Sequence, residues 1–356
     1  MGNTFSQFYF IPAPTVTENN CPDQAGRVHL VTGGYGGVGF ELCKILYQHN
    51  ATLYLAGRSN SKAQTAIQSL RRLYPKSRGR AEFLELDLSD LPTLKRAVAQ
   101  FLSKEDKLHV LTLNAGVRNA HPLRPKPLLS GACISLLISM VINHQVMNTP
   151  KGTQTAQGHE MQIGTNCLGS HLLYLLLRPI LLATAQNVPP GSVRVTWAGS
   201  IAIDVGSHKP GGMKFSPTDS TTPDTSIHPQ NLYAASKAGN LFLAAVNGRR
   251  DARASVLHLC WNPGNLRTDL IRHNSKLQNL MLEMVMNPPV MGAYTELFAA
   301  VREISMAETG SYIAPWGRKL SVRPDVEAGC RPEIEGGLGS ADKFVAWCDR
   351  LVAEYV

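Results

Sequence analysis

A tyrosine and a lysine in the stretch NLYAASKAGN, Tyr233 and Lys237, have the spacing in this sequence best suited to proton chemistry. In a helix, residues at i and i+4 lie on one face, one above the other. A free phenol, with a pKa of about 10, is a weak base at neutral pH, but a neighbouring ammonium favours its ionised form. Such a tyrosine can exchange a proton while a hydride moves to or from a cofactor. Chance also produces this spacing in many helices.

Two further polar residues fit the same chemistry. Ser200 lies just past the stretch SVRVTWA, a predicted strand, where its hydroxyl can polarise a carbonyl group. Asn166 falls inside a long predicted helix, in GTNCLGSHLL, where an amide is unfavourable unless its side chain has an internal partner. Tyr233, Lys237, Ser200 and Asn166 are therefore the candidate catalytic residues.

A glycine-rich stretch, TGGYGGVG at 32–39, lies where the first predicted strand gives way to the first predicted helix. Glycines let the backbone approach a pyrophosphate, whose charge then faces the helix N-terminus. Such a turn alone is also compatible with an ordinary tight turn, but its place in a βαβ unit favours dinucleotide binding. The predicted cofactor contacts in this turn are Thr32, Gly33, Tyr35, Gly37, Val38 and Gly39.

The end of the second predicted strand bears on the choice between NAD(H) and NADP(H). It reads AGRS and carries Arg58 with no acidic residue beside it. An NAD site usually has an acid there for the ribose 2′-hydroxyl, whereas a guanidinium pairs with a 2′-phosphate. The pattern favours NADP(H) over NAD(H), although a solvated surface arginine would look the same. Later strand ends supply the remaining predicted contacts, Asp87 and Leu88 beside the adenine and Asn114, Ala115 and Gly116 beside the cofactor.

An alternating series of strands and helices would hold these residues. The predicted strands are RVHLVT, ATLYLAG, AEFLEL, LHVLTL, SVRVTWA, RASVLHLC and GSYIAP, and the longest predicted helix covers about 158–185. This alternation predicts βαβ units and a parallel sheet covered on both faces. We expect an α/β protein with a single-domain doubly wound Rossmann fold and a mostly parallel seven-stranded sheet. The domain would span 27–356 after an N-terminal extension at 1–26, with a loop at 207–229.

Composition narrows the class of protein. The chain has 356 residues, 35 basic against 26 acidic, for a net charge of +9. This excess suits a phosphate-bearing ligand, but the basic residues are scattered and no RNA-binding motif occurs, so nucleic-acid binding is not expected. Seven cysteines without CxxC spacing predict reduced thiols and no metal site. The N-terminus lacks a signal-peptide pattern, so we expect a cytoplasmic protein; MGNTFS fits the short myristoylation pattern at Gly2, which chance also produces.

These motifs together resemble the short-chain dehydrogenase/reductase family, over nearly the whole chain from Arg27 to the last helix. The resemblance is carried by TGGYGGVG, NAG, Asn166, Ser200, YAASK and NPGNLRT. Glycine spacing alone would also fit the extended branch of the family, whereas NAG and NPGNLRT favour the single-domain branch. The stretches TENNCPDQAGRV, NPGNL, SYIAPWGR and ADKFVAWCDRLV are most similar to a fungal branch that resembles retinol-dehydrogenase-like and secondary-metabolism enzymes.

The resemblance implies a role for each candidate catalytic residue. Tyr233 would be the acid/base, and Lys237 would promote its ionisation and bind the nicotinamide ribose. Ser200 would hold the substrate carbonyl or hydroxyl, and Asn166 would hold a water linked to the lysine. The long loop between Ser200 and Tyr233 is one that fungal relatives also tolerate.

The resemblance also implies the reaction. Pro263 and Gly264 of NPGNLRT would pass under the nicotinamide, and Thr268 would bond the cofactor. The expected reaction interconverts a ketone and a secondary alcohol on a lipophilic small molecule, of the polyketide or terpenoid kind. Related enzymes are often dimers or tetramers, which leaves a homo-oligomer open for this chain, since no feature of the sequence decides the oligomeric state. Four methionines, Met281, Met284, Met286 and Met291, either line an adaptable apolar pocket or belong to the core.

One segment does not fit the family pattern. Removing 117–145 restores the unbroken pattern NAGVMNTPKGTQTAQG, and the codons GTGCGT for Val117–Arg118 and CAG for Gln145 would match fungal intron boundaries. We therefore interpret 117–145 as a retained intron or a gene-model error. The alternatives are a genuine extra helix, or a membrane-contacting lid as in a retinol- or steroid-type dehydrogenase. The apolar run at 128–142 is shorter than the roughly 20 residues that span a membrane.

The segment also creates a second hypothesis for the whole chain. An apolar helix without a packing partner would expose an adhesive patch beside the cofactor. The chain would then be a catalytically silent or poorly folding product of a mis-spliced gene.

Overall fold

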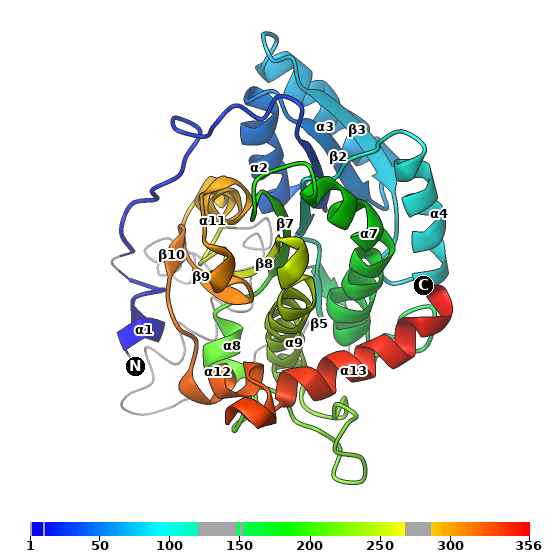
Figure 1. Ribbon diagram of the computed structural model, residues 1–356, viewed down its shortest axis with the longest axis vertical. Coiled ribbons are helices and arrows are strands. Elements are labelled where there is room, and N and C mark those ends of the chain that lie inside the picture. The colour runs from blue at the N-terminus through cyan, green and yellow to red at the C-terminus, as the bar shows by residue number, and fades with distance from the viewer. Residues whose placement is uncertain (1, 10, 120–146, 150–151, 268–285) are drawn as a thin grey trace, which may run out of the picture.

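The described part of the chain is built around one large sheet. The protein is represented by a computed structural model, which describes residues 2–9, 11–119, 147–149, 152–267 and 286–356 (Figure 1). Eight strands follow the order β10-β9-β8-β7-β4-β1-β2-β3. Their bounds are β1 Val28–Thr32, β2 Thr52–Gly57, β3 Arg80–Glu85, β4 Val110–Leu113, β7 Val193–Ala198, β8 Val256–Trp261, β9 Ser311–Ala314 and β10 Arg318–Lys319.

Seven of these strands are the predicted ones, and they pair with one another in parallel. The order reverses at β1, with β2 and β3 on one side and β4, β7 and β8 on the other, which is the doubly wound arrangement. The prediction of a mostly parallel α/β sheet is confirmed. The eighth strand, β10, is two residues long and antiparallel to β9. The turn between them holds Trp316 at φ 67° and Gly317 at φ 86°, left-handed conformations that reverse the chain.

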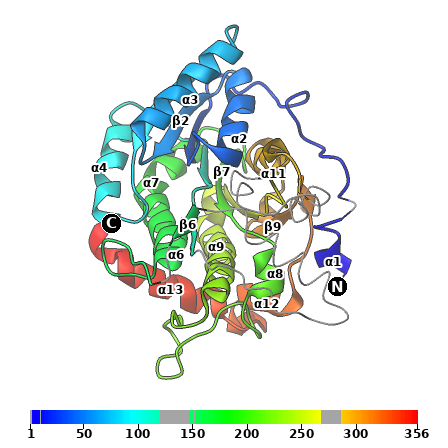
Figure 2. The same cartoon turned by 180° about the vertical axis from the view of Figure 1, so that it is seen from behind.

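Helices cover both faces of this sheet (Figures 1 and 2). One face carries α2 (Gly37–Gln48), α3 (Asn60–Leu73) and α11 (Pro289–Val301), and the other carries α4 (Leu91–Leu102), α7 (Ser170–Ala185), α9 (Pro229–Asp251) and α13 (Ser340–Val352). Adjacent strand residues alternate between the two cores: Leu30 packs with the second group and Val31 with the first. Buried parallel strands explain why their sequences are continuous apolar runs.

Short elements complete the described chain. They are the helices α1 (Gly2–Phe5), α6 (Met161–Ile163), α8 (Ala202–Gly206) and α12 (Pro324–Cys330), and the three-residue turns at 252–254, 306–308, 333–335 and 353–355. No helix or named strand occurs in the predicted loop between α8 and α9. A separate parallel pair, β5 (Val117–Asn119) and β6 (Met147–Thr149), flanks residues 120–146, so the predicted insert lies mostly outside the described residues.

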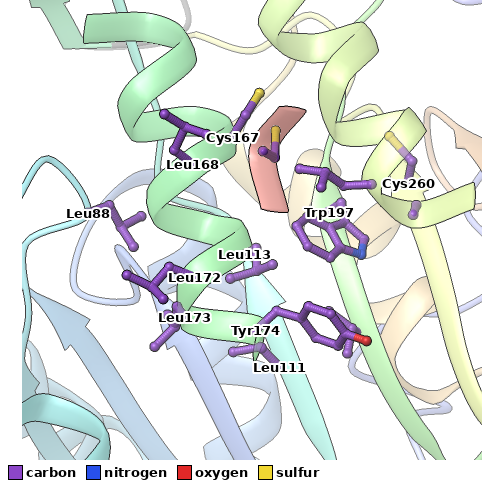
Figure 3. Close-up of a cluster of buried hydrophobic side chains, with 14 of the residues drawn as sticks. Leu88, Leu111, Leu113, Cys167, Leu168, Leu172, Leu173, Tyr174, Trp197 and Cys260 are labelled. Carbon is purple, nitrogen blue, oxygen red and sulfur yellow. The ribbon is translucent and has the colours of Figure 1, made fainter. Parts of the chain in front are cut away.

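The long predicted helix at 158–185 divides into three parts. It begins at Met161 after an N-cap at Glu160, and its second part, Gly164–Gly169, is a π-helix that leads into α7. Figure 3 shows Leu172, Leu173 and Tyr174 of α7 beside Leu111 and Leu113 of β4 and Trp197 of β7.

The same helical run, Met161–Ala185, is the one stretch within the described residues that is long and apolar enough to cross a membrane. Of the window that passes this test, 67% is buried inside the protein, because the helix packs on the sheet. Its apolar character is therefore accounted for by the core.

Candidate active site

Helix α9 carries the tyrosine and the lysine into the interior. Tyr233 is 3% exposed and Lys237 4% exposed. The Lys237 Nζ lies 5.6 Å from the centroid of the Tyr233 ring and donates a hydrogen bond to the Ala198 carbonyl oxygen at 3.0 Å. A buried ammonium needs such a partner, because an unpaired charge is costly away from water. The expected one-face arrangement of the two side chains is what α9 presents.

The end of strand β7 is hydrogen-bonded to the same helix. The Ala198 carbonyl oxygen also accepts a hydrogen bond from Asn240 Nδ2 at 2.8 Å. Ser200, two residues later, is 4% exposed, and its Oγ accepts from the Ala202 main-chain N–H at 3.2 Å. Ala202 packs in a buried cluster with Tyr233. The structure therefore brings the segment that carries Ser200 against the tyrosine.

Asn166 lies in the π-helix, and its side-chain amide makes three hydrogen bonds. Its Oδ1 accepts from the Val117 N–H at 2.7 Å, and its Nδ2 donates to the Val117 carbonyl at 2.9 Å and to Ser236 Oγ at 3.0 Å. These bonds explain an amide in the middle of a helix, and π-helical segments often occur at functional sites. A Cβ on Gly116 would lie 3.1 Å from Asn166 Oδ1 and 3.5 Å from Lys237 Nζ. Asn166 and Lys237 therefore flank the same glycine.

A cavity of about 480 Å³ opens at the carboxyl ends of β1, β2 and β4. This edge, where the strand order reverses, is the usual ligand site of doubly wound sheets. The described residues that line the cavity are Gly33, Tyr35, Gly36, Gly37, Val38, Ala56, Gly57, Arg58, Ser59, Lys62, Leu86, Asp87, Leu88, Ser89, Asn114, Ala115, Gly116, Val117, Met161, Thr165 and Lys237.

The glycine-rich turn has the shape of a pyrophosphate cradle. A Cβ on Gly36 or Gly37 would meet nothing within 4 Å, so both face open space. A Cβ on Gly39 would lie 2.5 Å from Asn114 Nδ2, which is itself bonded to the Thr32 carbonyl at 2.9 Å. The N-cap of α2, Gly36, provides no side-chain cap. The first N–H groups of this helix are thus available to an anion.

Thr32 lies beneath the cavity and does not line it. It is fully buried, and its Oγ1 accepts from the Ala115 N–H at 3.0 Å. Of the residues predicted to contact the cofactor, Thr32 therefore sits in a supporting position, where it joins β1 to the segment after β4.

The part of the cavity next to the end of β2 carries basic side chains. The main-chain N–H of Arg58 donates to Tyr35 Oη at 3.0 Å, which holds the glycine-rich turn against the end of β2. The Arg58 guanidinium lies 3.8 Å from an Asp87 carboxylate oxygen, and both side chains are partly exposed. Ser59 and Lys62 line the cavity beside Arg58.

Sequence reasoning missed several residues at this site. Ser59 caps helix α3 through Lys62 N at 3.4 Å, a signal that Ser followed by a helical pattern provides. Ser236 and Asn240 hold Asn166 and the Ala198 carbonyl. For both residues the available signal was a polar side chain in the interior of the helix that carries Lys237. Val117 meets Asn166 through its main chain alone, which no sequence pattern reveals.

The other predicted residues lie outside the described lining of the cavity. Tyr233, Ser200 and Asn166 are not among its lining residues, and Pro263 and Gly264 follow β8. Gly264 adopts φ 80° and donates its N–H to Asn262 Oδ1 at 3.0 Å, which shapes the turn after β8. Thr268 lies outside the described residues, as do Met281 and Met284. Met286 is buried and Met291 packs against the core, so these two methionines belong to the core.

The described residues contain no group of three or more His, Cys, Asp or Glu side chains placed to hold a metal ion. The six described cysteines are free thiols.

The sheet order, the glycine-rich turn and the cavity define a Rossmann-type dinucleotide-binding fold. The family profile described as "short chain dehydrogenase" matches residues 27–129. A short-chain dehydrogenase/reductase of Phomopsis amygdali is 38% identical, over 98% of this chain and 96% of its own length. The short-chain dehydrogenase/reductase bet4 of Neocamarosporium betae is 37% identical, over 98% and 92%. The chain belongs to the short-chain dehydrogenase/reductase family and is an oxidoreductase, as the resemblance to a fungal branch implied.

Solved structures agree with this fold. An uncharacterized protein of Mycobacterium paratuberculosis covers 95% of this chain and 97% of its own, with a TM-score of 0.62 and 22% identity. The RhlG/NADP active-site complex of Pseudomonas aeruginosa covers 81% and 94%, with a TM-score of 0.58 and 20% identity.

The residues present fit the nicotinamide dinucleotide that this family uses. Gly36 and Gly37 leave room where a Cβ would intrude, and the uncapped N-terminus of α2 supplies N–H donors for the pyrophosphate. Asp87 and Leu88 line the part of the cavity beyond β3, next to Arg58. Lys237 lines the same cavity.

Proposed function

We propose that this protein interconverts a ketone and a secondary alcohol on a lipophilic small molecule, with NADP(H) as the hydride carrier. The observation that carries the proposal is the buried pair on α9. Lys237 reaches both the Tyr233 ring and the cofactor cavity, at 5.6 Å from the ring centroid. Bound in the cavity, the cofactor would donate or accept the hydride.

The proton would move at the Tyr233 hydroxyl. The positive charge of Lys237 stabilises negative charge on the tyrosine oxygen, and burial of both side chains strengthens that attraction. Ser200 would hydrogen-bond the substrate oxygen. Asn166, bonded to Val117 and Ser236, would hold a water that links Lys237 to solvent.

Three side chains between the end of β2 and the first turn of α3 favour NADP(H) over NAD(H). Arg58 can pair with a 2′-phosphate in a bidentate manner, and Ser59 and Lys62 line the same part of the cavity. No acidic residue follows directly after β2, where a ribose 2′-hydroxyl would need one. Asp87 pairs with Arg58 at 3.8 Å, which would orient the guanidinium.

The substrate class rests on the family branch and on the segments around Ser200. Val205 on α8 is 36% exposed although it is apolar, and the predicted loop at 207–229 follows it. A polyketide or terpenoid secondary metabolite fits an enzyme of this fungal group. We place the protein in the cytoplasm, without a nucleic-acid partner.

The test is a comparison of the wild type with Tyr233→Phe. The phenyl ring preserves packing but removes the proton, so we expect consumption of NADPH with a panel of lipophilic ketones to fall at least about a hundredfold. Binding of NADPH, followed by its fluorescence, should stay within about threefold, because the cofactor is held mainly at the other end of the cavity. Unchanged turnover in Tyr233→Phe would refute the assignment.

A wild-type protein that binds NADPH tightly but reduces no carbonyl would instead favour the catalytically silent product. Ser200→Ala and Lys237→Ala, assayed beside Tyr233→Phe, keep the site assignment independent of one variant. We expect Lys237→Ala to weaken NADPH binding as well as turnover, because Lys237 lines the cofactor cavity.

We also propose that 117–145 is absent from the working enzyme. Asn166 bonds the main-chain N–H and C=O of Val117, and these groups do not depend on residue type. In the shorter chain, Val146 would follow Gly116 directly and could offer the same two groups. Messenger RNA sequenced across codons 110–150 tests this directly. A dominant transcript that retains these codons would refute it.

A further inference from the structure

The N-terminal extension inserts one side chain deep into the molecule. Gln7 is 1% exposed although α1, just before it, lies at the surface at the outer edge of the sheet (Figure 1). Two bonds fix the segment around it. Asn3 Nδ2 donates to the Ser321 carbonyl at 3.3 Å, and Arg318 donates to the Ser6 carbonyl at 2.8 Å. The chain at 3–7 is therefore seated along β10 and the residues that follow it.

The Gln7 carboxamide makes three hydrogen bonds to three different elements. Its Nε2 donates to Asp204 Oδ2 at 3.1 Å, and its Oε1 accepts from Asn262 Nδ2 at 3.0 Å and from Tyr312 Oη at 3.0 Å. Asp204 belongs to α8, Asn262 follows β8, and Tyr312 lies in β9. Buried polar groups with this many partners are costly to disturb.

The orientation of this amide is determined by its neighbours. Asn262 Oδ1 already accepts the Gly264 N–H at 3.0 Å, so Asn262 turns its Nδ2 toward Gln7. Asp204 accepts the Arg323 main-chain N–H at 2.7 Å and offers its other oxygen to Gln7. An amide supplies a donor and an acceptor at once, whereas a carboxyl group of similar length does so only when it is protonated.

The two segments joined by Gln7 are those that flank the proposed reaction. Asp204 lies four residues after Ser200, in the short helix that packs on Tyr233 through Ala202. Asn262 directly precedes Pro263 and Gly264, and it shapes their turn. In the proposed function, one segment holds the substrate oxygen and the other underlies the nicotinamide.

We propose that Gln7 is a positioning residue that sets the spacing between the Ser200 segment and the Pro263–Gly264 turn. This inference rests on the proposed function for its catalytic meaning. The N-terminal extension then helps to hold the active site in shape. A misplacement of about 1 Å between reacting groups can cost roughly a hundredfold in rate.

Several ionisable groups surround Gln7. Asp204 and Tyr312 touch it directly, Arg323 and Asp325 lie against Asp204, and Arg318 holds Ser6 beside it. Burial raises the pKa of the Asp204 carboxyl, against the hydrogen bonds from Arg323 and Gln7. A second carboxyl in place of the Gln7 amide would compete with Asp204 for protons.

The first experiment compares Gln7→Leu with Gln24→Leu. Gln24 is the matched control, because it lies in the same extension and is 2% exposed, but bonds His29 and the Pro22 carbonyl at the opposite end of the sheet. We expect Gln7→Leu to lower kcat roughly ten- to a hundredfold with an unchanged affinity for NADPH. Gln24→Leu should leave kcat within about twofold. Equal effects of the two variants would overturn the proposal.

The second experiment uses Gln7→Glu, which has nearly the same shape. When the introduced carboxyl is protonated, it can donate to Asp204 as the amide does, whereas the ionised carboxylate repels Asp204. We expect kcat of this variant to approach the wild-type value at low pH and to fall as pH rises, relative to the wild type at each pH. A defect that is independent of pH would indicate packing alone and would overturn the positioning role.

Hydrogen exchange separates this inference from the proposed function. Gln7→Leu should accelerate amide exchange at 200–206 and 262–266 together, while Gln24→Leu should not. If the wild type reduces no carbonyl, the proposed function fails. The exchange measurement still tests whether Gln7 couples the segments 200–206 and 262–266. Exchange that stays at the wild-type rate in both segments would refute the role of Gln7.

Discussion

The buried ammonium of Lys237 is held by the backbone rather than by an acidic side chain. Its hydrogen bond goes to the Ala198 carbonyl, which Asn240 shares. A carbonyl dipole compensates part of the charge but leaves it positive, whereas a carboxylate would neutralise it. The net positive field toward Tyr233 is what the proposed proton transfer needs.

A residue-level prediction concerns Arg58. Arg58→Ala removes the guanidinium that faces the end of the cavity, so the affinity for NADPH should fall roughly ten- to a hundredfold, as expected for the loss of a charge-assisted bidentate contact. The affinity for NADH should change less than about threefold, because NADH carries no 2′-phosphate. Titrations of both cofactors by fluorescence measure the ratio.

Arg71→Ala serves as the control for that experiment, since Arg71 is an exposed arginine in the last turn of α3, away from the cavity. It tests whether loss of any surface positive charge weakens NADPH binding. A parallel loss of affinity for both cofactors in Arg58→Ala would contradict the preference for NADP(H).

The glycine-rich turn between β1 and α2 shows how an element is fitted to its ligand. Gly39 leaves room for Asn114, and Gly36 leaves room in the cavity. Gly39→Ala would drive a Cβ to 2.5 Å from Asn114 Nδ2, which cannot move without losing its bond to Thr32. We expect a loss of about 1–3 kcal/mol in the free energy of unfolding, measured by urea denaturation.

Gly36→Ala is the counterpart of that variant. A Cβ there meets no protein atom within 4 Å, and Gly36 has an extended φ of −161°. Stability should therefore stay within about 0.5 kcal/mol, while the affinity for the cofactor falls because the methyl group enters the cradle. Equal loss of stability in both variants would show that the turn is not built around Asn114.

Sequence patterns were sufficient for the elements that carry continuous apolar runs. All seven predicted strands formed because their residues, such as Leu30 and Val31, face the two cores alternately. They were not sufficient for β10, whose two residues follow the left-handed Trp316 and Gly317. The π-helix around Asn166 also escaped prediction, because its amide bonds Val117, a residue distant in sequence.

In the candidate site, too, the sequence predicted the features that local patterns determine and missed those that depend on distant contacts. Residue types at strand ends, such as Arg58 and Asn114, were readable because parallel strands end at one edge of the sheet. The contacts of Gln7 were not readable, since its partners Asp204 and Tyr312 come from segments that only the folded chain brings together.

On the scale of the whole molecule, a buried polar network joins the helix layer to the sheet. Asp251 at the end of α9 accepts from Tyr174 at 2.6 Å, from Arg178 at 2.8 Å and from His258 at 3.2 Å. Trp197 Nε1 lies 3.4 Å from His258 Nδ1. An indole only donates, so His258 is neutral with its proton on Nε2, which then donates to Asp251.

This network predicts that acid destabilises the protein. Burial lowers the pKa of His258 below its usual value, against the bond to Asp251. Burial alone would raise the pKa of Asp251, but its hydrogen bonds from His258 and Tyr174 lower it on balance. Both groups bind protons more weakly in the folded than in the unfolded chain. Their contribution to stability is therefore present above the unfolded pKa of each group and is lost as pH falls from there through the folded pKa, first for His258 and then for Asp251.

Urea denaturation between about pH 7.5 and pH 5 measures this loss, and it should show a free energy of unfolding that declines as pH falls. His258→Gln should lower stability at neutral pH by about 1–3 kcal/mol, because it breaks buried hydrogen bonds. In the same variant the free energy of unfolding should also decline less steeply as pH falls, because the imidazole with the lowered pKa is gone. His208→Gln, on an exposed residue of the 207–229 loop, should keep the wild-type slope. An unaltered slope in His258→Gln would show that the acid sensitivity arises elsewhere.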